Sequence, residues 1–130
     1  MSESGYSMKI TECKVHKLVA DVTLLTKGRA LLVRYEDTSK YDNQSGWFVP
    51  DDYLQHVEHP EKAAKRILKE QLDLTVRDVS LAFIESFNDG AWHLIFHYKS
   101  VVSTVPKVSF GENVGRPDGS LLENFPRGQR

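Results

Sequence analysis

The sequence has little of several features that mark whole classes of protein. It holds a single cysteine, Cys13, so no disulfide can form within the chain, and this suits a reducing compartment. No apolar run approaches the roughly 18 residues of a membrane-spanning helix, and the polar start MSESGYSMKI lacks the apolar segment of a signal peptide. Neither charge is in excess, with 17 Lys and Arg against 18 Asp and Glu, so bulk charge does not indicate a nucleic-acid partner. We therefore expect a cytoplasmic protein without a membrane span.

The composition is that of one globular domain. The 130 residues are 40% hydrophobic and 27% charged, an ordinary balance for a soluble chain. A chain of this length buries roughly two thirds of its unfolded surface, which is enough for one core. We expect the domain at 17–103, after a flexible or edge segment at 1–16. The tail at 104–130 contains three of the five prolines, and we expect it to be at most partly ordered, with a short helical turn at 121–125.

Apolar segments predict two β-hairpins with a short strand between them. The runs at 17–25 and 29–36 flank a Lys-Gly turn. The runs at 75–87 and 91–102 flank Asn-Asp-Gly, whose residues tolerate positive φ. Residues 47–50, WFVP, are typical of a short strand that ends at its proline. Cys13 has no catalytic context, and we interpret it as a packing residue.

The spacing of apolar residues predicts a helix over 60–72. Pro60 suits the first helical position, where its missing N–H would have no partner, and Glu61 places a negative charge at the helix N-terminus. A stripe at three- and four-residue steps is expected to face the core. Its members are Ala63, Ala64, Ile67, Leu68, Gln71 and Leu72.

The segment at 46–74, GWFVPDDYLQHVEHPEKAAKRILKEQLDL, joins the short strand, a loop and this helix. It resembles the Nudix hydrolases, whose tryptophan-containing strand ends in Pro-Gly-Gly. A box then follows: Gly, five residues, Glu, seven residues and Arg-Glu-aliphatic-x-Glu-Glu-x-Gly-aliphatic. With Arg66 on the box arginine, the other matches fall in register without a gap: Trp47, Pro50, Glu58, Leu68, Glu70 and Leu74. The resemblance covers 17–102 and implies an α+β fold, a Nudix-like α/β/α sandwich with a mixed β-sheet and the box helix at about 60–72.

The departures from this pattern bear on activity. Asp51 and Asp52 stand where the pattern has glycine, Ile67 and Gln71 where it has glutamate, and Asp73 where it has the late glycine. The resemblance implies that the helix glutamates hold a divalent metal, usually Mg²⁺, which neutralises a diphosphate and activates water. Isoleucine has no ligand atom and glutamine offers only a neutral oxygen, whereas Mg²⁺ requires hard oxygen ligands. We therefore expect weak or absent Mg²⁺ binding and a lapsed catalytic site.

The remaining box residues admit two interpretations. Glu70 is either a surviving metal ligand or the i,i+4 surface partner of Arg66, since the family's box arginine orients a glutamate. Glu58 matches a position that stabilises the loop before the helix. Asp51 and Asp52 form either a solvated turn or a relocated cation site that uses Glu70 as a further ligand.

Candidate ligand-binding residues lie upstream of the box. Nudix domains line a nucleotide pocket at the positions of Arg34, Tyr35, Trp47 and Phe48. Aromatic rings stack on bases and arginine pairs with phosphate. Core packing of Trp47 or Phe48 and a surface role for Arg34 are the alternatives.

The histidines have no assigned role. His56 and His59 flank Glu58 in too irregular a pattern for a recognised ligand set. His93 and His97 share a strand face about 13 Å apart, too far to bind one metal together. Glu85 is a candidate cross-strand neighbour for them.

Three functions remain open from the sequence. The first is a catalytically impaired Nudix-like domain that binds a nucleotide-type ligand, such as a nucleoside diphosphate derivative, or a protein partner. The second is an active pyrophosphohydrolase that uses Mg²⁺ or Mn²⁺ at a site rebuilt from Asp51, Asp52, Glu58 or Glu70. The third is an interaction module with no small ligand. The first and third need no cofactor, and a homodimer is compatible with all three.

Overall fold

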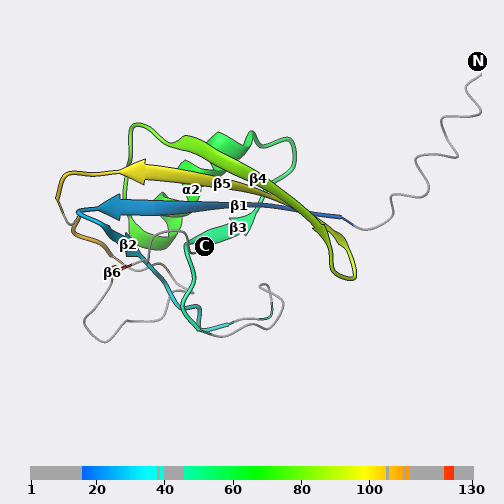
Figure 1. Ribbon diagram of the computed structural model, residues 1–130, viewed down its shortest axis with the longest axis horizontal. Coiled ribbons are helices and arrows are strands. Elements are labelled where there is room, and N and C mark those ends of the chain that lie inside the picture. Colours follow the sequence, from blue (N-terminus) through cyan, green and yellow to red (C-terminus); the bar gives the residue numbers. More distant parts are fainter. Residues whose placement is uncertain are drawn as a thin grey trace, which may run out of the picture.

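A six-stranded mixed sheet with helix α2 packed against it forms the domain (Figure 1). The computed structural model describes residues 16–37, 39, 46–104, 106–109, 111 and 122–124. The elements are β1 (His16–Thr26), β2 (Arg29–Leu31), β3 (Asp51–Tyr53), α2 (Pro60–Leu72), β4 (Ser80–Asn88), β5 (Trp92–Val101) and β6 (Leu122–Asn124). This confirms the expected α+β fold. In this part of the chain, no helix is long and apolar enough to cross a membrane.

Strand β1 is the centre of the sheet. The strand order is β4-β5-β1-β2-β6, and β3 pairs with β1 on the same side as β2. The pairing of β1 with β5 is parallel over ten residue pairs, and every other strand pairing is antiparallel. The core lies between β1 and α2, because Ala20, Val22 and Leu24 are buried against the helix stripe.

The first hairpin forms where the sequence predicts it. Thr26 pairs with Arg29 across a two-residue turn, and both turn residues have positive φ, 51° at Lys27 and 77° at Gly28. A turn of this kind matches the twist of the flanking strands. The second strand is shorter than expected, because β2 ends at Leu31 and is followed by isolated bridges such as that from Val33 to Phe48.

The prediction of a strand at 47–50 is wrong in position. Strand β3 begins at Asp51, so Asp51 and Asp52 lie in a strand rather than in a solvated turn. The prediction ended the strand at Pro50 because proline has no N–H to donate, but its carbonyl can still accept a hydrogen bond. The carbonyl of Pro50 accepts a hydrogen bond from the N–H of Val22 at 3.0 Å, and pairing with β1 continues from there.

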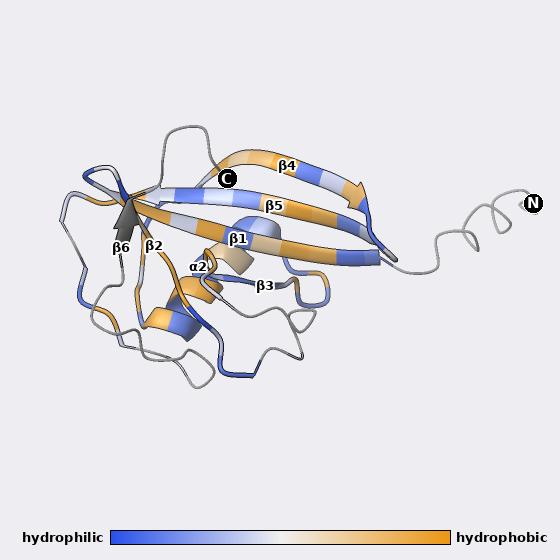
Figure 2. Ribbon diagram, turned by 60° about the horizontal axis from the view of Figure 1, so that its bottom comes forward, coloured by the Kyte–Doolittle hydropathy of each residue, from blue (hydrophilic) through white to orange (hydrophobic). Residues whose placement is uncertain are grey.

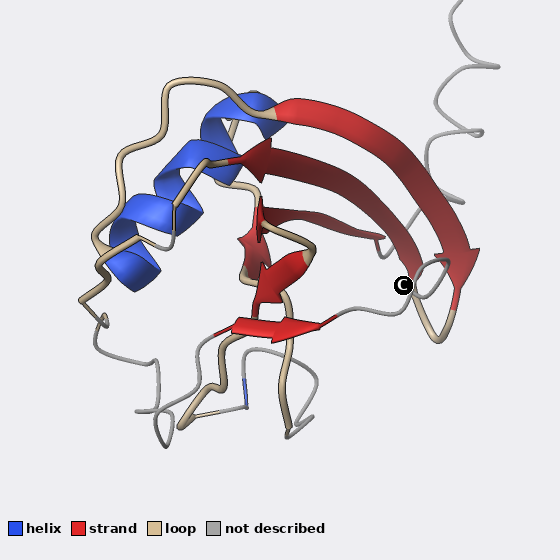
Figure 3. Ribbon diagram, turned by 60° about the vertical axis from the view of Figure 1, so that its left-hand side comes forward, coloured by secondary structure: helices blue, strands red, loops and turns tan. Residues whose placement is uncertain are grey.

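Helix α2 spans Pro60–Leu72, as its spacing predicts. Nδ1 of His59 accepts a hydrogen bond from the N–H of Glu61 at 3.0 Å, so this histidine is the N-cap. All six residues of the expected stripe are buried. Figure 3 shows the helix lying along one side of the curved sheet.

The C-terminal part of the chain departs from the predictions in two places. Residues 75–79 precede β4 and are not in a strand, and 122–124 form strand β6 beside β2 instead of a helical turn. The bonding of β6 to β2 is a long-range contact that local sequence does not reveal. The expectations for 1–15, including Cys13, lie outside the described residues.

The segment after β5 closes the C-terminal end of α2. The N–H groups of Ser109 and Gly111 donate to the carbonyls of Leu72 and Gln71 at 3.0 and 2.8 Å. These carbonyls belong to the last turn, which has no partner within a helix. A Cβ at Gly111 would collide with the carbonyl oxygen of Glu70, so glycine is required for this close approach.

Asp73 is the C-cap that follows α2, and it has a left-handed conformation with φ 55° and ψ 38°. A glycine is usual at such a position because a Cβ costs roughly 1 kcal/mol there. The Asp73 side chain is exposed and pairs with Lys69 at 2.8 Å, a contact worth only a few tenths of a kcal/mol.

We expect Asp73→Gly to be more stable than Asp73→Ala by about 1 kcal/mol. Both variants lose the contact with Lys69, and only glycine adopts the left-handed conformation without strain. Urea unfolding of the two variants measures the difference. Equal stability would show that the backbone at this helix end does not require positive φ.

Candidate functional site

The guanidinium of Arg66 forms a bidentate pair with the carboxylate of Glu58. Its Nε lies 2.8 Å from Oε2 of Glu58, and its Nη2 lies 3.0 Å from Oε1 of the same residue. Oε1 also accepts a hydrogen bond from the N–H of Gln55 at 2.9 Å. A bidentate pair of this kind fixes orientation as well as charge. Glu58 therefore ties the loop before α2 to the middle of the helix.

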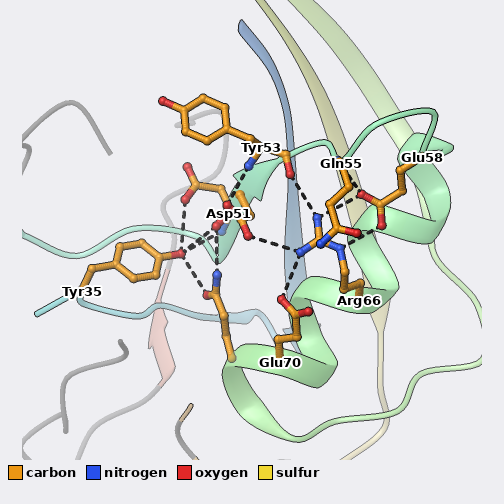
Figure 4. A network of polar contacts seen from close by, with 9 residues as sticks. Tyr35, Asp51, Tyr53, Gln55, Glu58, Arg66 and Glu70 are labelled. Carbon is orange, nitrogen blue, oxygen red and sulfur yellow. Dashed lines mark hydrogen bonds and ion pairs between the residues drawn. The ribbon is translucent and has the colours of Figure 1, made fainter. Parts of the chain in front are cut away.

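Two further carboxylates and a carbonyl complete the surroundings of Arg66 (Figure 4). Nη1 lies 3.0 Å from Oε1 of Glu70 and 3.3 Å from Oδ2 of Asp52, and Nη2 donates to the carbonyl of Tyr53 at 3.0 Å. The guanidinium thus bridges α2, β3 and the intervening loop. Three carboxylates share one positive side chain.

Burial makes this network electrostatically strong. The side chains of Arg66, Glu58 and Asp52 are 15%, 12% and 11% exposed, whereas that of Glu70 is 56% exposed. The hydrogen bonds from Arg66 lower the pKa of Glu58 below its ordinary value, although burial acts in the opposite direction. The same contacts, led by Glu58, raise the pKa of Arg66. The pair remains ionised at neutral pH.

A second network holds the amide of Gln71. Its Oε1 accepts a hydrogen bond from the hydroxyl of Tyr35 at 2.9 Å, and its Nε2 donates to the carbonyl of Asp51 at 2.9 Å. The Tyr35 oxygen in turn accepts from the N–H of Asp51 at 2.9 Å. Gln71 is buried, so its amide joins α2 to β3 through polar atoms that face one another.

The residues of α2 do not fit the binding of Mg²⁺. Ile67 is fully buried in the core and has no ligand atom. The side-chain oxygen of Gln71 is neutral and already accepts from Tyr35, and the Glu70 carboxylate is paired with Arg66. A hard cation needs several free oxygen ligands. Among the residues that the structure describes, no three His, Cys, Asp or Glu side chains are arranged to hold a metal ion.

The aspartates of β3 point to different partners. Asp52 and Glu70 both lie beside Arg66, and its guanidinium contacts both carboxylates. Oδ1 of Asp51 lies 3.2 Å from the hydroxyl of Tyr35. The structure thus brings Asp52 and Glu70 together around a cation that belongs to the chain itself.

The four candidate ligand residues separate into two pairs. Tyr35 is buried and hydrogen-bonded, and Phe48 is partly buried with its ring stacked at 6.4 Å from that of Tyr35. Tyr35 therefore belongs to the core, and Phe48 packs against it. Arg34 is exposed, with its guanidinium 5.4 Å from the ring centre of Trp47, which is also exposed. Arg34 and Trp47 therefore remain accessible to a ligand.

The histidines of β5 belong to a network that the sequence only partly indicates. His97 lies 2.7 Å from Oδ2 of Asp21 and 2.9 Å from Oε1 of Glu85. Burial lowers the pKa of His97, but the two carboxylates outweigh burial and raise it above its ordinary value. His93 stacks on Phe87 with ring centres 4.7 Å apart. Asp21 was missed, although an acid within the apolar run at 17–25 was a signal for it.

The loop histidines differ in their surroundings. His59 caps α2, as described above, and His56 is exposed. Neither shares a metal ligand set with Glu58, whose carboxylate is engaged by Arg66.

Comparison with known proteins identifies the fold. No protein-family model matches the chain, and no curated protein sequence matches it. Among solved structures, the NUDIX domain of Shewanella oneidensis NrtR complexed with ADP ribose has a TM-score of 0.70 and 18% identity, covering 97% of this chain and 84% of that one. A MutT/nudix family protein from Enterococcus faecalis has a TM-score of 0.67 and 15% identity, covering 88% of this chain. The chain spans about half of that protein, 49% of its length.

A third structure with the same fold contains a nucleotide and a metal. It is a bifunctional NMN adenylyltransferase/ADP ribose pyrophosphatase from Francisella tularensis, complexed with AMP and a Mn ion. Its TM-score is 0.65 at 12% identity, covering 95% of this chain and 38% of that one. These similarities show that the chain has the Nudix fold.

The Glu58–Arg66 pair makes stability depend on pH. Because folding lowers the pKa of Glu58, its ionised form stabilises the native state at pH values above the ordinary 4.5. This contribution is lost as the pH falls through the lowered value. We expect Glu58→Gln to cost about 2 kcal/mol at neutral pH and progressively less on acidification.

Urea unfolding of both proteins between neutral and acidic pH measures this effect. Glu36→Gln is the matched control, because Glu36 is exposed and does not contact Arg66. A stability difference between Glu58→Gln and the parent that stays constant down to acidic pH would contradict the proposed pair.

Proposed function

We propose that this chain is a Nudix-fold domain that binds a nucleoside diphosphate derivative without hydrolysing it by a metal-dependent reaction. The observation that carries the proposal is the environment of Glu70. It is the one carboxylate at the three positions of α2 where the Nudix pattern has glutamate, and it is paired with Arg66. The other two positions hold Ile67, which packs in the core, and Gln71, which is hydrogen-bonded to Tyr35.

The chemistry of the ligand follows from what is accessible. A nucleoside diphosphate derivative combines an aromatic base with a negatively charged diphosphate. Trp47 offers an exposed ring for stacking, and Arg34 beside it offers a positive charge. Two structures of the same fold contain ADP ribose and AMP, and this similarity supports the choice of ligand class.

An active hydrolase would need its metal ligands in a different arrangement. It would have to draw them from Asp51, Asp52, Glu58 and Glu70, three of which surround Arg66. The guanidinium would have to leave before a divalent cation could occupy the same space. Losing it would also remove the bidentate pair with Glu58, so the same residues cannot serve both arrangements at once.

Ligand binding is tested by thermal unfolding with ADP-ribose and ADP. A ligand at 100 times its Kd stabilises the native state by about 2.7 kcal/mol, so we expect a clear rise in Tm with at least one of the two. Trp47→Ala and Arg34→Ala should each weaken binding at least about fivefold, since one stacked base contributes about 1–3 kcal/mol.

Arg77→Ala is the control for loss of positive charge, because Arg77 is exposed and lies in the segment before β4. Its effect on the Tm shift should be small. An unchanged Tm with both nucleotides would contradict the proposal and favour an interaction module without a small ligand.

The absence of metal-dependent hydrolysis is tested separately. We expect no formation of nucleoside monophosphate from ADP-ribose or other nucleoside diphosphate derivatives with Mg²⁺ or Mn²⁺, as followed by anion-exchange chromatography. Product that requires the metal and disappears in Glu70→Gln, but persists in Glu36→Gln, would establish a working site that includes Glu70.

A further inference from the structure

Among the strands that the structure describes, β4 forms one edge of the sheet. It pairs with β5 on one side, and none of the other described strands pairs with its outer side. All nine of its residues are exposed. Figure 1 shows β4 and β5 as a long hairpin whose tip projects beyond α2. An edge strand of this length presents unpaired backbone groups to any second strand.

The sequence of β4 does not protect this edge. SLAFIESFN contains no lysine, arginine or proline, the residues with which proteins commonly guard an exposed edge. A register shift between Leu81 and Phe83 is its one irregularity. The only charged residue is Glu85, and its carboxylate is bound by His97 of β5 at 2.9 Å. That contact directs the charge toward β5 and away from the outer edge.

Much of the β4–β5 hairpin is hydrophobic (Figure 2), and several of its large apolar residues are exposed. The exposed fractions are 47% for Leu81, 46% for Phe83, 50% for Ile84, 38% for Phe87 and 44% for Trp92. If each of these residues has a full surface of about 200 Å², they expose about 450 Å² in total. Large apolar residues are therefore exposed along the β4 edge.

These side chains lie on both faces of the sheet. Phe83 and Phe87 pair with His97 and His93, so they occupy one face. Ile84 pairs with Phe96 and occupies the opposite face, together with Leu81 and Trp92. A partner laid over one face would leave the other exposed. A strand that adds to the outer edge of β4 contacts both faces at once.

We propose that a second copy of this chain pairs with β4, strand to strand and antiparallel, about a two-fold axis. Such an interface uses the same surface of both copies. With the axis at Glu85, Phe83 of each copy lies opposite Phe87 of the other, which gives two aromatic cross-strand pairs. Each Glu85 at the axis remains bound to His97 of its own chain.

The available area is sufficient for such a dimer. The four apolar side chains of β4 expose about 720 Å² over two copies if each residue has a full surface of about 200 Å², and the paired backbones add to it. A specific interface requires a total of about 1,000 Å² or more. This proposal concerns the β4 edge and is independent of the proposed nucleotide binding.

Sedimentation velocity over a dilution series tests the proposal with the full chain. We expect a dimer that dissociates on dilution. Ile84→Lys should shift the sedimentation to that of a monomer, because lysine places a charge in the apolar edge. Val101→Lys should leave the dimer intact, since Val101 is 72% exposed but lies at the end of β5, outside the paired segment. Circular dichroism confirms that both variants remain folded.

Disulfide cross-linking tests the position of the axis. In a Cys13→Ser background, Glu85→Cys should form a dimeric cross-link under mild oxidation, because the two copies of residue 85 meet at the axis. Ser80→Cys, near the start of the same strand, should not, because its two copies lie far apart.

A wild-type chain that is monomeric at every concentration overturns the proposal. If the β4 amides of such a monomer resist hydrogen exchange, the chain itself covers the edge. If they exchange freely, the edge is open to a different partner. A dimer that survives Ile84→Lys, or a cross-link from Ser80→Cys equal to that from Glu85→Cys, also overturns it.

Discussion

The positive charge of Arg66 holds together the surroundings of α2. Three carboxylates, Asp52, Glu58 and Glu70, would repel one another without a cation between them. Here the cation is a side chain of the helix itself, and it arrives with the fold. The bidentate contact with Glu58 also fixes the loop before α2, and the contact with the carbonyl of Tyr53 fixes β3. The geometry of the site is therefore built by internal ion pairs.

The two neutral residues of the helix fit the same arrangement. An isoleucine at 67 adds to the core between α2 and β1, where a carboxylate would be costly to bury. The amide of Gln71 supplies an acceptor to Tyr35 and a donor to Asp51, and a carboxylate could supply only acceptors. Both residues are thus matched to their neighbours, and neither has a free anionic oxygen for a metal.

The secondary-structure elements that the sequence predicted are those determined by neighbouring residues. Helix α2 follows from apolar spacing and Pro60, and the first hairpin follows from Lys-Gly between two apolar runs. Strands β3 and β6 have three residues each, too few for periodicity to reveal them, and they exist because β1 and β2 offer them partners. The spacing of the box residues predicted only some of the contacts that Arg66 makes. The contact of Asp21 with His97 joins residues 76 positions apart and depends on the parallel pairing of β1 with β5.

We infer that α2 is organised by Arg66 and not by a divalent metal. Paramagnetic broadening of backbone amide signals during a Mn²⁺ titration tests it most directly, because the broadening depends steeply on the distance from the ion. We expect the amides of Glu70, Gln71 and Asp52 to broaden no more than those near exposed acidic residues such as Asp89. Selective broadening of Glu70 and Asp52 at Mn²⁺ concentrations that leave Asp89 unaffected would contradict it.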